Sequence, residues 1–145
     1  MKFFWKLNIV SALIALALFV SIELQLNFYR IWRITGWETD TVNNVIAIIH
    51  VVGFILSTIV FVILIKKWLE GKKASFWSII LWLPYLILFI CIFANLCPIT
   101  NRGEMPAPVS GLFIMGQLIV YPIYLMVINT FCTTTVFEIE EKAVE

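Results

Sequence analysis

Four apolar stretches, each close to the length that crosses a lipid bilayer, limit what this chain can fold into. The clearest runs from Thr41 to Ile65, and its only titratable side chain is that of His50. A helix that spans the hydrocarbon core needs about 20 predominantly apolar residues. Because lipid offers the backbone no hydrogen-bond partner, such a segment must satisfy its own amide groups, and a helix does this within one segment. The stretch is therefore predicted to be a transmembrane helix.

The composition supports the same interpretation for the whole chain. Hydrophobic residues make up 62% of it and charged residues 13%, whereas a soluble domain has about 45–50% and about 25%. The excess lies in four runs, for which we expect helices over residues about 4–28, 42–65, 76–97 and 109–133. These helices use nearly all of the chain. We therefore expect residues 1–145 to form one all-α domain, an integral membrane four-transmembrane-helix bundle running up-down-up-down.

The basic residues predict how this bundle is oriented. All seven lysines fall on one predicted side and all three arginines on the other. Since cytoplasmic loops carry an excess of basic residues, both termini are expected in the cytoplasm. Residues 136–145 would then form an acidic cytoplasmic tail that is exposed and partly disordered. The short loops and the lysine, isoleucine and phenylalanine bias favour a prokaryotic cytoplasmic (inner) membrane.

The connections between the predicted helices carry most of the remaining charge. Residues 29–40 hold two arginines and two tryptophans, which predicts a segment at the membrane surface that Gly36 ends. Residues 66–75 form a short basic connection, and membrane lipids are the partner its lysines would contact. The candidate lipid head-group contacts are Lys66, Lys67, Lys72 and Lys73.

Polar side chains inside the predicted spans are the best indication of function, because they cost free energy in hydrocarbon. Four of them fall in the outer half of the predicted bundle. At a helical rise of about 1.5 Å per residue, they lie roughly 12 Å or less below the outer ends of their helices. We expect them to converge in one polar cluster, with Arg30 as a candidate charge partner for the carboxylate. The cluster comprises Glu23, His50, Asn95 and Gln117.

Three interpretations of this cluster stay open. It could be a ligand or proton site, since histidine and a buried carboxyl both exchange protons near neutral pH. The interpretation that we favour is that it holds the helices together, and the third is that it contacts a partner subunit. No cofactor or metal is expected. The cysteines and the single histidine do not have metal-ligand spacing, and the chain has no second histidine to ligate a haem.

The sequence carries no catalytic motif of the soluble enzymes, and its basic residues are split across the predicted membrane, which excludes a nucleic-acid surface. We expect an accessory or assembly subunit of a larger membrane protein complex, with other membrane subunits or a homo-oligomer as partners. The first alternative is an oligomeric small-solute, ion or proton-coupled transporter or channel protomer. The second is a membrane enzyme acting on a lipid or quinone, with Glu23 and His50 as acid and base.

Overall fold

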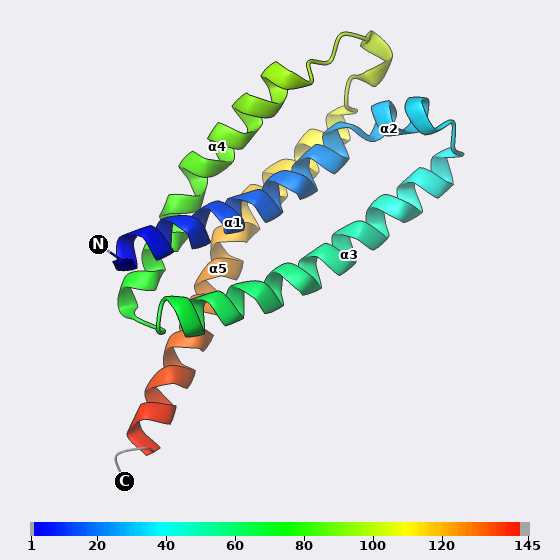
Figure 1. The fold of residues 1–145 in the computed structure, drawn as a ribbon. Coiled ribbons are helices and arrows are strands. Elements are labelled where there is room, and N and C mark those ends of the chain that lie inside the picture. Colours follow the sequence, from blue (N-terminus) through cyan, green and yellow to red (C-terminus); the bar gives the residue numbers. More distant parts are fainter. Residues whose placement is uncertain (1, 143–145) are drawn as a thin grey trace.

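The computed structural model describes residues 2–142, and within that range the chain is helical with no strand. The main helices are α1 (Lys2–Leu26), α2 (Phe28–Thr35), α3 (Thr39–Ile63), α4 (Ser78–Leu96) and α5 (Pro108–Lys142). Three short turns join them: the π-helical η1 (Leu64–Trp68) and the 3-10 helices η2 (Lys73–Trp77) and η3 (Arg102–Glu104). Figure 1 shows their arrangement.

Four of these helical segments are long and apolar enough to cross a membrane, as predicted. They cover Lys2–Leu26, Thr39–Trp68, Lys73–Leu96 and Pro108–Phe137. The short α2 lies between the first two, in the stretch predicted as a surface segment, and it ends at Gly36. That glycine has φ +66°, and its N–H donates to the carbonyl of Trp32 at 3.0 Å. Glycine adopts this left-handed conformation without steric cost, so the predicted break is confirmed.

The last helix continues past its predicted end at about residue 133, through Lys142. No glycine or proline follows Pro122, so nothing in the sequence forces the helix to stop. The hydroxyls of Thr133, Thr134 and Thr135 each donate to the carbonyl four residues earlier, at 2.6 to 3.0 Å. Residues 136–142 of the predicted tail are therefore helical. Residues 143–145 and the glutamate side chains beyond Phe137 lie outside the described part of the chain.

The core is organised around α1. In the most apolar 18-residue window of each candidate span, 39% of the residues are buried for α1 but only 11% for each of the other three. Its buried residues recur every three or four positions, which gives one continuous apolar face. They are Leu7, Val10, Ser11, Ile14, Ala15, Leu18 and Ile22. Against this face pack α4 and parts of α3 and α5, including Phe61, Trp82 and Leu125.

A close contact joins α5 to the loop between α3 and α4. Gly71 in that loop has φ +55°, and a Cβ atom added there would lie 2.8 Å from Cγ2 of Val136 and 3.3 Å from the carbonyl oxygen of Cys132. Any larger residue would therefore push α5 away as well as strain the backbone. The helical continuation of α5 beyond residue 133 supplies part of this contact.

Replacing Gly71 by alanine should destabilise the fold more than replacing Gly36 by alanine. Both sites have positive φ, so both variants bear the roughly 1–2 kcal/mol cost of a left-handed L-residue. Only at Gly71 does the new methyl group meet other atoms, which should add about 1–3 kcal/mol. Unfolding of both variants in detergent micelles, followed by circular dichroism, measures the difference. Equal losses would show that the contact with Val136 is not formed.

Candidate functional site

A groove of about 1250 Å³ runs between α1, α3 and α5 in the middle of their membrane-length segments. α3 forms one wall from Ile49 to Phe61 and α5 another from Leu112 to Tyr124. In Figure 1, α3 lies along one flank of the molecule, apart from the closely packed α1 and α4. Rim side chains such as Ile55, Leu112 and Val120 are more than half exposed, so the groove is open along its side.

The imidazole of His50 lines this groove, but its ring nitrogens face other protein atoms. Nδ1 lies 2.8 Å from the carbonyl oxygen of Ile46, one turn earlier in α3. Nε2 lies 3.2 Å from the carbonyl oxygen of Ser21 and 3.3 Å from Nε2 of Gln25, both in α1. A neutral ring that donates from Nδ1 to Ile46 can accept from Gln25 through Nε2. His50 therefore ties α3 to α1.

The other polar side chains along the groove also join one helix to another. The amide of Gln117 donates to Oγ of Ser21 at 3.2 Å, and the hydroxyl of Tyr121 donates to the carbonyl of Ile14 at 2.7 Å. Further along, the hydroxyls of Tyr124 and Thr58 lie 2.6 Å apart and link α5 to α3. Because these polar atoms turn toward neighbouring helices, the groove presents a mostly apolar surface.

The four residues of the predicted cluster do not share one network. His50 and Gln117 both contact Ser21, His50 beside its carbonyl oxygen and Gln117 at its hydroxyl, whereas Glu23 accepts a hydrogen bond from Asn27 at 2.8 Å. Residues two apart on an α-helix point about 200° away from each other. Glu23 therefore faces away from both Ser21 and Gln25. Asn95 is exposed and donates to the carbonyl of Cys91 in its own helix at 2.7 Å.

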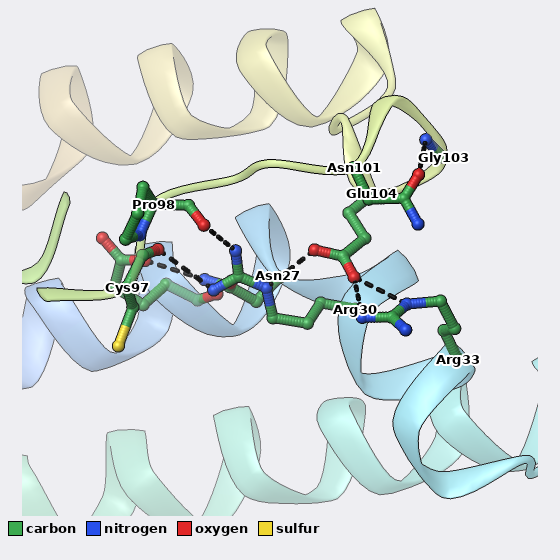
Figure 2. A network of polar contacts seen from close by, with 9 residues as sticks. Asn27, Arg30, Arg33, Cys97, Pro98, Asn101, Gly103 and Glu104 are labelled. Atoms are coloured by element: carbon green, nitrogen blue, oxygen red, sulfur yellow. Dashed lines mark hydrogen bonds and ion pairs between the residues drawn. The ribbon is translucent and has the colours of Figure 1, made fainter.

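Arg30, the expected charge partner of Glu23, forms its ion pair with Glu104 in the loop before α5 (Figure 2), while its charge also acts on the Glu23 carboxylate. Its Nε donates to one carboxylate oxygen at 3.0 Å, and Nε of Arg33 donates to the other at 2.6 Å. The remaining guanidinium nitrogens of Arg30 donate to the carbonyls of Cys97 and Pro98 at 3.1 and 2.9 Å. Arg30 and Arg33 therefore fasten the loop between α4 and α5 to α2. We call these three charged residues the carboxylate clamp.

The clamp favours the ionised form of its carboxylate. Hydrogen bonds from Arg30, and then from Arg33, lower the pKa of Glu104 below its ordinary value of 4.5 despite opposing desolvation. The side chain of Glu104 is only 3% exposed because the arginines cover it. The side chain of Arg33 is nevertheless 54% exposed, so solvent screens part of the electrostatic gain.

A second polar region lies fully buried between α4 and α5. It was not predicted from the sequence. The amide nitrogen of Asn129 donates to Oγ of Ser78 at 3.3 Å, and both residues are 0% exposed. Ser75 and Trp82 lie on the same face of the η2–α4 segment at a spacing of i, i+3 and i+7 around Ser78. That spacing was a signal available in the sequence. The contact positions α4 against α5 in the half of the bundle that holds the lysine-rich loop.

Among the described residues, no group of three His, Cys, Asp or Glu side chains could hold a metal ion. The four lysines predicted to contact lipid head groups lie around the turn between α3 and α4. Lys66 lies over the ring of Phe131 at 4.8 Å, and Lys72 pairs with Glu70. Lys67 and Lys73 are exposed.

Comparison with known proteins gives no further assignment: no protein-family model, no curated protein and no solved structure matches this chain.

Replacing Glu104 by glutamine should lower the unfolding temperature at neutral pH, because the clamp loses its charge. A carboxylate with a depressed pKa stabilises the fold above its unfolded pKa and loses that contribution as the pH falls through the folded pKa. The difference between the parent protein and Glu104→Gln should therefore shrink below about pH 4.5. Thermal unfolding in detergent between pH 7 and pH 3 measures it.

The matched control for this experiment is Glu38→Gln. It also removes one negative charge, but from an exposed residue at the N-terminus of α3. It should leave the unfolding temperature almost unchanged across the range. A clamp variant that tracks the parent protein at every pH would show that the ion pairs do not stabilise the fold.

Proposed function

We propose that this protein is an accessory or assembly subunit of a larger membrane protein complex, and that a transmembrane helix of its partner packs into the groove between α1, α3 and α5. The observation that carries the proposal is a pair of glycines on two walls of the groove. Gly53 belongs to α3 and Gly116 to α5, and a Cβ atom added to either would meet nothing within 4 Å. In membranes, small residues at a helix surface allow another helix to approach closely.

The size of the groove also suits a helix better than a small molecule. Pockets for drug-sized ligands measure about 300–1,000 Å³, and this groove measures about 1250 Å³. A helix is about 10–12 Å across, so that volume holds roughly two to three of its turns. Because the groove is open along its side, the partner helix would extend beyond it at both ends.

The chemistry of the walls favours the same occupant. The side chains of His50, Gln117 and Tyr121 each make a hydrogen bond to α1. What they leave in the groove is apolar side chain and glycine backbone, which is the surface against which a lipid-soluble helix packs by van der Waals contact. The low burial of α3, with only Val42, Ile46 and Phe61 buried, leaves most of that helix free for a partner.

We further propose that the four helices run up-down-up-down with both termini in the cytoplasm, in a prokaryotic inner membrane. The positive-inside rule supports this orientation, since the lysines of α1 and those of the turn after α3 lie at the same end of the molecule. Lys72 in that turn lies 5.8 Å from the ring of Phe3 in the first turn of α1. The arginine-bearing α2 lies at the other end (Figure 1).

A second candidate function is the binding of a lipid-like or quinone-like molecule in the same groove, as the membrane enzymes that act on such substrates do. The observation that favours it is the presence of His50 and Gln117 among the lining residues, one on each wall. A rotation of either side chain would offer a hydrogen bond to a polar head, while the apolar walls would hold its chain.

Filling the groove with Gly53→Leu or Gly116→Leu tests the proposal. Neither leucine meets another atom of this chain at its Cβ, so helicity and unfolding temperature should be preserved. A partner helix would be displaced, and its recovery with the protein from native membranes should fall about tenfold, since overpacking costs about 1–3 kcal/mol. A photo-crosslinking residue at Leu112 identifies what lies on the groove, whether a foreign polypeptide, a second copy or a lipid.

Gly111→Leu is the matched control, because Gly111 also lies in α5 with open space around it but does not line the groove. It should leave both recovery and crosslinking unchanged. Crosslinks to a polypeptide that Gly53→Leu abolishes support the subunit function. Crosslinks only to lipid-like molecules, sensitive to His50→Leu and Gln117→Leu, would replace it with the second candidate.

A further inference from the structure

Lysines from separate segments lie at the end of the molecule opposite α2, where α1 begins and α3 is followed by α4. Lys2 and Lys6 belong to the first turns of α1, and four more lysines lie between Lys66 and Lys73. Within residues 2–7 and 64–77 the only acidic residue is Glu70. In these two segments six lysines accompany one carboxylate, that of Glu70, which lies within the basic turn.

Glu70 is held between lysines of two different segments. Its Oε2 lies 2.5 Å from Nζ of Lys72. The hydrogen bond and charge of Lys72 lower the pKa of Glu70. Nζ of Lys72 lies 5.8 Å from the ring of Phe3, and Lys6 follows Phe3 by one turn on the same face of α1, so Lys6 lies beside this ion pair. The backbone of Glu70 adopts φ +55°, a left-handed conformation that non-glycine residues rarely hold. The turn thus presents an anion of the protein itself to Lys6 and Lys72.

The site remains open to an external anion. The side chains of Lys72 and Glu70 are 57% and 55% exposed, so their ion pair is surrounded by solvent and easily exchanged. Nζ of Lys72 also lies 5.8 Å from the ring of Phe3, which places the ammonium beside the first turn of α1. An anion with two or more acceptor oxygens could therefore contact both lysines once the Glu70 carboxylate moves aside.

Three tryptophans indicate that this anion comes from the membrane. Trp5, Trp68 and Trp77 lie at the same edge, in the segments that carry the lysines, and are 41–67% exposed. Tryptophan is enriched at the level of the lipid head groups, where its ring is apolar on one side and polar on the other. The two lysines are thus set at the depth of lipid phosphates.

We propose that Lys6 and Lys72 form a binding site for the phosphate of an anionic phospholipid, and that Glu70 occupies the site when no lipid is bound. Lys73, next to Lys72 and exposed, adds attraction from the side. Glu70 then acts as an internal competitor that limits how tightly the head group binds. This site is separate from the groove, and it stands or falls independently of the function proposed for the groove.

Native mass spectrometry of the purified protein with phosphatidylglycerol or phosphatidylcholine tests the proposal. Lys72→Ala and Lys6→Ala should each reduce the retention of phosphatidylglycerol about fivefold, which corresponds to about 1 kcal/mol per lysine near the surface. Glu70→Gln should raise that retention, because it removes the competing charge. None of the three should change the retention of phosphatidylcholine.

Arg102→Ala is the control, since it removes one exposed positive charge from the other end of the molecule. It should leave phosphatidylglycerol retention unchanged. Phosphatidylglycerol retention that stays the same or falls in Glu70→Gln would overturn the proposal, even if the lysine variants misfold. Thermal stabilisation by inorganic phosphate alone, with no preference between the two lipids, would overturn the lipid as its source.

Discussion

Hydrocarbon supplies no hydrogen-bond partner, and the arrangement of polar side chains in this protein follows from that constraint. Many polar side chains in the membrane-length segments reach a carbonyl or a side chain of their own or a neighbouring helix. His50 accepts from Gln25 of α1, Gln117 and Tyr121 reach α1 from α5, and Asn129 reaches α4. Polar residues in these helices are used first as connections between them.

This use of polar residues explains the shape of the bundle. α1 receives connections from α3 and α5 and packs along its length on α4, so it is the helix that the others share. α3 and α5 touch each other chiefly near Thr58 and Tyr124, and between that contact and α2 they leave the groove open. The carboxylate clamp closes the end beyond the groove by fastening the loop before α5 to α2.

Much of this fold could be predicted from the sequence, because length and hydrophobicity alone define a membrane-length helix. The partners of individual polar residues could not. Glu23 and His50 have similar predicted depths, which favours a contact between them. In the folded chain, Ser21 and Gln25 occupy the face of α1 that meets His50, and Glu23 lies on the opposite face. Arg30 was assigned to Glu23 because the two are close in sequence. It binds Glu104, which is distant in sequence and lies in a loop whose path only the folded chain determines. The spacing of Ser75, Ser78 and Trp82 marks one side of the Asn129 contact, but Asn129 itself is a single amide in an apolar helix, so its partner follows only from the folded chain.

We propose that α3 and α5, which meet near Thr58 and Tyr124, separate between that contact and α2 to receive a helix from another polypeptide. The most direct measurement is a cryo-electron microscopy map of the protein extracted from its own membrane together with native lipids. The account predicts a rod of helical density that belongs to a different chain, seated between α3 and α5 beside Gly53 and Gly116. A map in which α3 has closed onto α5, or in which only lipid chains fill the space, would contradict it.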